Sequence, residues 1–361
     1  MPHQDMPMDV VSRLSHRPLD VLWSVIKIII RDPPKPSEVN FQNRASSLGI
    51  LGRLPVELLH EVLKNLDFQS IIRFSSVSIQ GKCVSSSLSA YRDTMNHAPD
   101  ALSALSQTKL LHLHSASQLH NALRSERCAT CPEYGVCLFL PTCERCCLQC
   151  LGLNPTRRVI TVWDAIETFA LSPEMAKQLP GTFSYPVIDD DQLGHYPPPN
   201  PRELVSISAA KDVLVSIHGS AENAIEAIRR RKSYEQNAGE VSRLRALLSD
   251  STGVNTLMLP YYGNAGPPVN WSSWAVILFP SFSPPDIVEH GVWCKGCAYI
   301  FNKDLWLPDH SIPNIVPTGW SPNHFLCGML SRAYSRTGLS AHIPHCAGAQ
   351  QLLIDQAAPK A

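Results

Sequence analysis

The side chains most able to do chemistry in this 361-residue chain are its twelve cysteines, and most of them are grouped. Seven lie in the stretch CATCPEYGVCLFLPTCERCCLQC, from Cys128 to Cys150. Cys128 and Cys131 form one C-x2-C pair, and Cys147 and Cys150 form another after fifteen intervening residues. Each pair can wrap a tight turn that points two sulfur atoms at one ion, so four thiolates can surround Zn²⁺ as a tetrahedron. This spacing predicts a structural zinc site.

The second half of that site has an alternative. Cys143 and Cys146 also form a C-x2-C pair, and the spacing alone leaves open which pair joins Cys128 and Cys131. For Cys137 and Cys143 a different role is open, that of a small buried hydrophobic residue, because free cysteine is among the most buried residue types.

A second, more dispersed group of metal-binding residue types lies nearer the C-terminal end. WCKGC supplies Cys294 and Cys297, and AHIPHC supplies His342 and Cys346. Residues four apart share a helix face, so the second pair can complete a Cys3His zinc site with the first. The pattern therefore predicts two structural zinc ions in the chain.

The sequence leaves the histidine of this second site open. Pro344 lies between His342 and Cys346 and disturbs a helix interior, so the pair fits only if a helix begins near the proline. His345 is an alternative to His342, and His290 and Cys327 are more distant alternatives.

The elements nearest the N-terminal end are predicted to be helices. Leu59, Val62, Leu63 and Leu66 form one apolar face of a helix over about 55–66, with Pro55 in its first turn. Asp67 is a suitable N-cap for a second helix over 68–78. A third helix is predicted from the spacing of Val84, Leu88, Tyr91 and Met95. Residues 48–95 are therefore a three-helix unit, too small to be well supported by its own core and suited to a protein partner.

This unit resembles the F-box, the helical motif that binds the Skp adaptor of cullin-based ubiquitin ligases. The resemblance rests on Leu54-Pro55-Val56-Glu57-Leu58-Leu59, then Leu63, Leu66-Asp67, Ile71-Ile72-Arg73 and Val77-Ser78. It departs from the family after the valine, where Ile79 to Lys82 replace the usual basic and aromatic residues. The resemblance implies that the adaptor is bound by Leu54, Pro55, Glu57, Leu58, Leu59, Leu63, Ile71 and Ile72.

The cysteine regions resemble a group of fungal F-box proteins with zinc-binding clusters. RCCxxC recurs in that group, which favours Cys147 and Cys150 as the second ligand pair. HCAGAQQLL resembles the C-terminal end of the same group, where a histidine-x3-cysteine pair precedes a helix, and this favours His342 with Cys346. The resemblance covers about 48–152 and 285–355.

The fold class predicted from these patterns is α+β and mainly helical: a three-helix F-box followed by an irregular, zinc-stabilised α+β body. The predicted parts are a flexible tail at 1–47, the F-box at 48–95, a helical connector at 96–122 in which Ser115 caps a helix, the body at 123–355 and a disordered tail at 356–361. Within the body, the two zinc knuckles are predicted near 128–150 and 294–346, and the proline-rich stretch 185–201 predicts a hinge. A long helical pattern covers 220–248, and a buried strand is predicted at 274–279.

Composition narrows the function classes. Thirty-one basic residues balance thirty-one acidic ones, which disfavours nucleic acid as a partner. The apolar run Val21 to Ile30 has ten residues, whereas a membrane span needs about 20, so no membrane partner is expected. Neither a phosphate-binding loop nor a nucleophile elbow occurs in the sequence, and sites with four protein ligands leave no open position for substrate.

The predicted function is that of a non-catalytic F-box adaptor, a substrate receptor that binds the Skp subunit and presents a client protein for ubiquitination. The alternatives are a Skp-bound regulator outside a ligase and a zinc-ribbon protein that binds nucleic acid. Many cysteines without a secretion signal indicate a reducing compartment, so the expected location is the cytoplasm or the nucleus.

Overall fold

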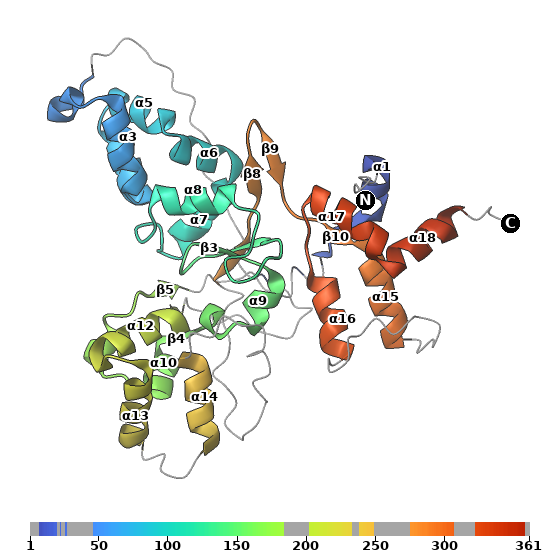
Figure 1. Cartoon of the computed structure of the whole chain (residues 1–361). Coiled ribbons are helices and arrows are strands. Elements are labelled where there is room, and N and C mark those ends of the chain that lie inside the picture. The colour runs from blue at the N-terminus through green and yellow to red at the C-terminus, as the bar shows by residue number, and fades with distance from the viewer. Residues whose placement is uncertain are drawn as a thin grey trace.

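The computed structural model describes residues 7–19, 22, 26, 46–183, 202–232, 238–248, 275–306 and 322–357. These residues form a mainly helical α+β protein with four small sheets of two or three strands, as the sequence predicted (Figure 1). The predicted hinge at 185–201 lies outside the described residues. Among the helices that the structure describes, none has the length and apolar character needed to span a bilayer.

The N-terminal helical unit contains more helices than predicted. After the 3-10 turn η1 (Gly49–Arg53) its helices are α3 (Val56–Asn65), α4 (Phe68–Val77), α5 (Ile79–Ser87), α6 (Ser89–His97), α7 (Pro99–Gln107) and α8 (Ala116–Arg124). The first two predicted helices are confirmed. The predicted third helix is two helices, because the backbone of Leu88 is extended (φ −69°, ψ 117°) and interrupts the helical geometry. Leu88 is buried, so its side chain still faces the core as the apolar pattern required.

Helices on both sides of the predicted boundary at residue 95 share one hydrophobic core. Leu119 and Leu123 of α8 pack in the same cluster as Leu59 and Phe68. The N–H of Ala116 donates to the carbonyl of Leu66 at 2.9 Å, which joins the start of α8 to the end of α3. Ser115 and Gln118 form a complete capping box, so the predicted cap of this helix is confirmed. The stretch 96–122 thus packs as part of the helical unit.

The N-cap of α4 supports a stability prediction. Asp67 accepts hydrogen bonds from the backbone N–H of Ser70 at 2.8 Å and from the Ser70 hydroxyl at 2.7 Å. Partial burial raises the pKa of Asp67, but these hydrogen bonds outweigh it and hold the pKa below its ordinary value of 3.8. A lowered carboxyl pKa stabilises the fold above the unfolded value, and the contribution is lost as the pH falls through the folded value.

We therefore expect Asp67→Ala to lower the free energy of unfolding by about 1 kcal/mol at pH 7, and by less near pH 3.5. Urea unfolding of both proteins at the two pH values measures the difference. Asp67→Asn is the matched control, because its amide oxygen still caps the helix but does not titrate in this range. A deficit for Asp67→Ala that is the same at both pH values would contradict the assignment.

A three-stranded sheet divides two hydrophobic cores. It consists of β2 (Cys137–Phe139), β3 (Glu144–Cys146) and β7 (Val276–Leu278) in the order β3-β2-β7, with all pairs antiparallel. Alternate side chains of a strand point to opposite faces. Leu138 accordingly packs in the core of the helical unit, whereas Cys137 and Phe139 pack in a second core beneath it. The predicted strand at 274–279 contains β7.

A third unit follows the sheet in the chain. Its elements are η2 (Pro155–Arg157), β4 (Val159–Thr161), α10 (Val162–Phe169), α11 (Pro173–Ala176), β5 (Thr182–Phe183), β6 (Glu203–Ser206), α12 (Ile207–His218), α13 (Ala221–Lys232) and α14 (Ala238–Leu248). Its strands pair in the order β4-β6-β5, and its helices have their own core. The helical pattern predicted over 220–248 corresponds to α13 and α14, and residues 233–237 between them lie outside the described part of the chain.

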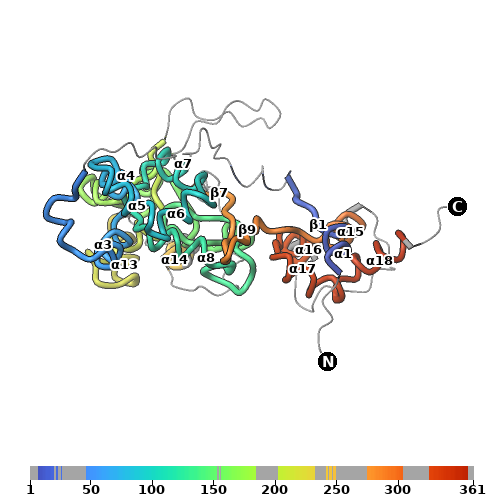
Figure 2. The backbone as a smooth tube through the Cα atoms, turned by 90° about the horizontal axis from the view of Figure 1, so that it is seen from above, coloured from blue at the N-terminus to red at the C-terminus, as the bar shows by residue number. Residues whose placement is uncertain are grey.

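A C-terminal unit lies to one side of these elements (Figure 2), and its residues Trp293 and Ala333 pack in the second core. It is connected through the hairpin β8 (Ser281–Ser283) and β9 (Ile287–Glu289). The unit consists of β10 (Trp293–Cys294), α15 (Lys295–Trp306), α16 (Pro322–Ser331), α17 (Arg336–His342), the 3-10 turn η5 (Ile343–His345) and α18 (Ala347–Ala357). The disordered tail predicted from residue 356 begins inside α18, and residues 358–361 lie outside the described part.

The start of the chain belongs to this C-terminal unit. Residues 8–14 form α1 (Met8–Leu14) and residues 15–16 form β1 (Ser15–His16), which pairs with β10. Figure 2 shows α1 and β1 beside α15 and α17. The prediction of a flexible tail over 1–47 is therefore wrong for residues 8–16, because Val11 and Leu14 are buried. Residues 27–45 of the predicted tail lie outside the described part.

Candidate metal centres and adaptor-binding face

The first cysteine group has the dimensions of a tetrahedral metal site. The sulfur atoms of Cys128, Cys131, Cys147 and Cys150 all lie within 4.8 Å of one another. Cys131 Sγ is 3.6 Å from both Cys147 Sγ and Cys150 Sγ. Four sulfurs at about 2.3 Å from one Zn²⁺ stand roughly 3.8 Å apart, whereas a disulfide needs about 2.05 Å. The arrangement fits one metal ion and no disulfide.

Two turns and a helix end place these sulfurs. Cys128 and Cys131 lie in the loop between α8 and β2, where the N–H of Thr130 donates to Cys128 Sγ at 3.4 Å. Cys147 is the N-cap of α9 (Leu148–Leu153), and its sulfur accepts a hydrogen bond from Cys150 N at 3.3 Å. The structure thus brings Cys147 and Cys150, rather than Cys143 and Cys146, to the first pair.

The remaining cysteines of this region lie outside the ligand group. Cys137, Cys143 and Cys146 are buried and belong to neither cysteine group. Loss of solvation raises the pKa of Cys143 and of Cys146 to about 12 and raises that of Cys137 well above its ordinary value. These three stay neutral thiols and pack as small hydrophobic residues, which was the alternative role predicted for Cys137 and Cys143.

Two of the ligand thiols behave differently: the pKa values of Cys128 and Cys131 are lowered, whereas hydrogen bonds with these two raise the pKa values of Cys147 and Cys150. Hydrogen bonds from the thiols of Cys131, Cys147 and Cys150 lower the pKa of Cys128, so a negative charge is favoured at this sulfur. The thiolate is the form that binds metal. Within this region, charge is therefore concentrated where the four sulfurs meet.

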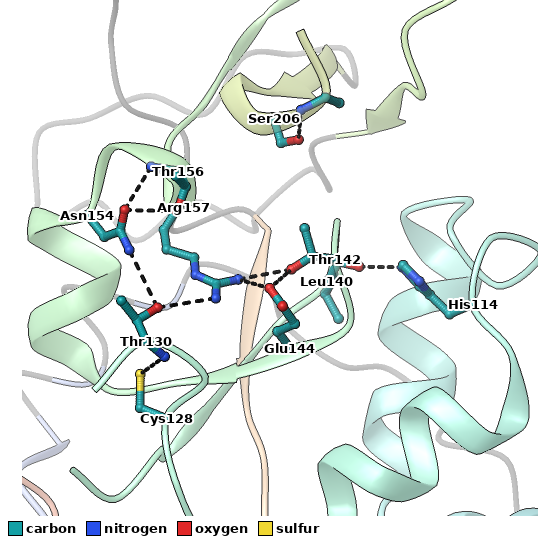
Figure 3. A network of polar contacts seen from close by, with 11 residues as sticks. His114, Cys128, Thr130, Leu140, Thr142, Glu144, Asn154, Thr156, Arg157 and Ser206 are labelled. Carbon is teal, nitrogen blue, oxygen red and sulfur yellow. Dashed lines mark hydrogen bonds and ion pairs between the residues drawn. The ribbon is translucent and has the colours of Figure 1, made fainter. Parts of the chain in front are cut away.

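A polar network holds the loop that contains Cys128 and Cys131 against the β2–β3 hairpin (Figure 3). Arg157 forms an ion pair with Glu144 at 2.6 Å and donates to Thr130 Oγ1 at 3.4 Å. Thr130 lies between Cys128 and Cys131, and Asn154 donates to the same hydroxyl at 3.5 Å. Partners of this kind orient metal ligands and are part of a metal site's design.

A buried arginine ties the same region to the helical unit. Arg145 on β3 is 2% exposed and donates to the carbonyls of Ala122 on α8 at 3.0 Å and Phe279 at 3.1 Å. It also donates to the carbonyls of Gly135 and Pro280. Burial lowers its pKa to about 10, so it remains charged at neutral pH. Gly135 is required here, because a Cβ atom at that position would collide with the Arg145 side chain.

The second group also fits a tetrahedral site. Cys346 Sγ is 3.8 Å from Cys294 Sγ and 3.9 Å from Cys297 Sγ, and Cys297 Sγ is 3.3 Å from His342 Nε2. The other ring nitrogen of His342 meets the Tyr334 hydroxyl at 3.3 Å, and the two rings stack at 4.6 Å. Tyr334 therefore orients the imidazole so that Nε2 faces the three sulfurs.

Pro344 is accommodated by a break between two helices. His342 ends α17, the proline sits in η5, and Cys346 is the residue before α18. His345 is exposed and Cys327 is exposed, and neither they nor His290 join the group that contains His342. The structure thus selects His342 among the histidines that the sequence left open.

Electrostatics at the second group favour a cation. Hydrogen bonds from Cys294 and Cys297 lower the pKa of Cys346. Burial lowers the pKa of His342, but hydrogen bonds and charge from Cys294 and Cys346 raise it to about 9. The negative field that holds a proton on this imidazole would equally attract a metal cation in its place.

The predicted adaptor-binding residues divide between the surface and the core. Leu54, Pro55, Glu57, Leu58 and Ile72 are exposed. The other three predicted members are buried in the core of the helical unit, and their adaptor role stays a prediction: Leu59, Leu63 and Ile71.

Further apolar side chains extend the exposed face beyond the predicted residues. Around α3, η1 and α4 the exposed apolar residues are Ile50, Leu51, Leu54, Val56, Leu58, Val62, Ile72 and Val77. Leu58 and Val62 are 51% and 54% exposed and lie four residues apart on α3, so they form one stripe. The i, i+4 spacing of Leu58 and Val62 is visible in the sequence. The apolar periodicity, however, also fits Val62 on the predicted buried face with Leu59 and Leu63. We refer to these eight residues as the apolar face.

Comparison with known families supports the resemblance at this face. Residues 51–80, which are 30 of the 361 residues, match the model of the F-box domain. The match covers α3 and α4 and does not reach either cysteine group. Neither the curated proteins nor the solved structures include a match to the chain. F-box domains generally bind the Skp subunit of cullin ligases, and the N-terminal helical unit of this chain carries an F-box domain.

Proposed function

We propose that this protein is a substrate receptor that binds the Skp subunit of a cullin-based ubiquitin ligase and presents a client protein for ubiquitination. The observation that carries the proposal is the coincidence of the F-box match at 51–80 with the apolar face. Six of the eight residues of that face have an exposed fraction between 39% and 54%, and the other two, Ile50 and Val77, reach 77% and 82%. We take these exposed apolar side chains around α3 and α4 as the interaction site, since exposed apolar patches mark protein interaction sites.

The chemistry of ubiquitin transfer then belongs to other subunits. F-box proteins are typically non-catalytic adaptors. Each cysteine group here offers four protein ligands, which fill a tetrahedral Zn²⁺ and leave it no position for substrate. We infer that the two proposed zinc ions are structural and shape the body that selects the client.

The location proposed is the cytoplasm or the nucleus. All twelve cysteines are free thiols in the structure. Thiols in such number persist in a reducing compartment, which is also where metal-bound thiolates are maintained.

The test is a comparison of co-purified proteins with the proteasome inhibited. We expect the wild-type chain to retain both adaptor and clients. Leu58→Ala with Val62→Ala should lose the adaptor and keep the clients, and those clients should accumulate because they are no longer ubiquitinated. Leu113→Ala is the matched control, since Leu113 is 40% exposed in the same helical unit but lies outside the apolar face.

The reciprocal variant is best placed in the C-terminal unit. Cys294→Ser with Cys297→Ser should lose clients and keep the adaptor, because the buried core of that unit shares no residue with the core of the helical unit. A variant of the first cysteine group would separate client binding from adaptor binding less well, since Arg145 joins that region to α8. If the double serine variant stays folded yet loses the adaptor as completely as the Leu58 and Val62 variant, this division of roles is wrong.

Other results separate the alternatives. Unchanged client levels with intact adaptor binding would favour a Skp-bound regulator outside a ligase. Salt-dependent binding of single-stranded nucleic acid by the zinc-bearing body would favour the zinc-ribbon alternative.

A further inference from the structure

The N-terminal segment and the second cysteine group are joined by strand pairing across more than 270 residues of sequence. Ser15 pairs with Cys294, and His16 pairs with Trp293, in an antiparallel arrangement. Cys294 is one of the four residues of the Cys3His group. The backbone of a candidate metal ligand is therefore held on one side by the start of the chain.

Two apolar side chains anchor the same segment. Val11 is 2% exposed and Leu14 is 0% exposed, and both belong to the core that contains Cys297, Leu339 and Ile343. They lie three residues apart and so share one face of α1. Met8, on the same helix, is 55% exposed. The segment thus buries one face in the C-terminal unit and leaves the other in solvent.

Polar contacts fix the end of α1. Lys295 Nζ donates to the carbonyl of Arg13 at 2.7 Å, and Arg13 Nη2 donates to Gln356 Oε1 at 2.7 Å. A cation at the C-terminal end of a helix is favourable, since the last carbonyls of the helix lack partners within it. Lys295 follows Cys294 directly in the chain, so this contact also holds α1 next to a residue of the Cys3His group.

Neither element of the segment has the length to form by itself. The helix α1 has seven residues and β1 has two, and isolated helices shorter than about 12 residues are marginal in water. Their order must come from the surface beneath them. That surface is built from separate pieces of chain. β10 and α15 contribute Cys294 and Cys297, α17 contributes His342, and Cys346 lies between η5 and α18.

We propose that the Cys3His group is a metal-dependent binding site for the chain's own segment Met8–His16, and that metal binding and docking of this segment stabilise each other. The proposal rests on the proposed occupancy of the group by Zn²⁺. A bound ion links the pieces of chain that form the docking surface, and the docked strand in turn holds the backbone of Cys294 in place. By linkage, the factor by which bound metal strengthens docking equals the factor by which docking strengthens metal binding.

The first experiment measures zinc release from the full-length chain to a metallochromic chelator. Two phases are expected, and the phase that is missing from the Cys294→Ser, Cys297→Ser chain belongs to the C-terminal centre. Val11→Asp with Leu14→Asp should accelerate that phase about a hundredfold, because two buried apolar anchors are lost, and should leave the other phase unchanged. Met8→Asp with Ser12→Asp is the control, since it adds the same charge to the exposed face of α1.

The second experiment runs in the opposite direction. His342→Ala with Cys346→Ser should abolish hydrogen-exchange protection of the amides in residues 10–16, while protection in α8 persists and shows that the rest of the chain is folded. Unchanged protection of residues 10–16 in this variant would overturn the proposal, as would an unchanged release rate in the Val11 and Leu14 variant.

Two further outcomes are distinguishable. A wild-type chain that holds only one zinc, with no phase assignable to the C-terminal centre, would remove the metal on which the proposal rests while leaving the adaptor function intact. Protection of residues 10–16 that falls on dilution, together with dimers in sedimentation, would show that a second copy's segment fills the site, which would overturn the intramolecular arrangement proposed here.

Discussion

Protein purified without chelator should contain about two zinc ions per chain, and removing them should unfold both zinc-bearing regions. Structural zinc sites contribute about 10–16 kcal/mol of apparent binding free energy, and this energy is also folding energy. That is as large as the whole stability of a typical domain, about 5–15 kcal/mol. Elemental analysis measures the metal content, and thermal unfolding followed by circular dichroism with and without chelator measures the consequence.

The effect of losing the first zinc should spread beyond its own loops. Cys137 and Cys146 pair across β2 and β3, and the opposite face of this sheet completes the core of the helical unit. We therefore expect Cys128→Ser with Cys147→Ser to retain one zinc and to lower the unfolding temperature of the helical unit as well. Cys83→Ser with Cys327→Ser is the matched control, because both of these cysteines are exposed. A zinc-free chain, or an unfolding curve that chelation does not shift, would refute the proposed metal sites.

The second large effect concerns the apolar face. Leu58→Ala with Val62→Ala should weaken binding to the Skp adaptor by roughly 2–4 kcal/mol, because a few apolar anchors near an interface centre usually carry most of its energy. Calorimetric titration of the purified adaptor measures the change. Folding should be nearly unaffected, since both side chains are about half exposed before binding.

Leu59 provides the opposite case on the same helix. It is 6% exposed and packs in the core, so Leu59→Ala should lower the free energy of unfolding by about 2–5 kcal/mol. Leu113→Ala should change neither adaptor affinity nor stability appreciably. Equal adaptor affinity for the wild type and for the Leu58 and Val62 variant would count against an adaptor-binding role for the apolar face.

The sequence predicted local features well. The C-x2-C pairs, the cap at Ser115 and the first two helices each depend on residues close together in the chain, and the structure has all of them. The orientation of α3 was predicted only in part, because Val62 and Leu63 are adjacent apolar residues and periodicity alone does not show which one faces inward. Tertiary contacts with α8 decide this, and Leu63 takes the buried position.

What the sequence could not show were contacts between distant segments. Nothing local distinguishes MDVVSRLSH from a flexible tail, since its order comes from β10 and the C-terminal core. The same holds for Arg145, which among the described residues donates to carbonyls from α8 and from residues 279–280 rather than to an acidic side chain. Such partners become visible only when the chain is folded.

The position of β7 in the sheet β3-β2-β7 affects how the chain folds during synthesis on the ribosome. The core of the helical unit includes Ile277, Phe279 and Phe282, which follow α8 by more than 150 residues. At about 5–20 residues per second, a ribosome needs roughly 10–30 s to reach them after finishing α8. During that interval Leu138 and Leu140 lack part of their covering, so the nascent helical unit should depend on chaperones until residue 282 has emerged.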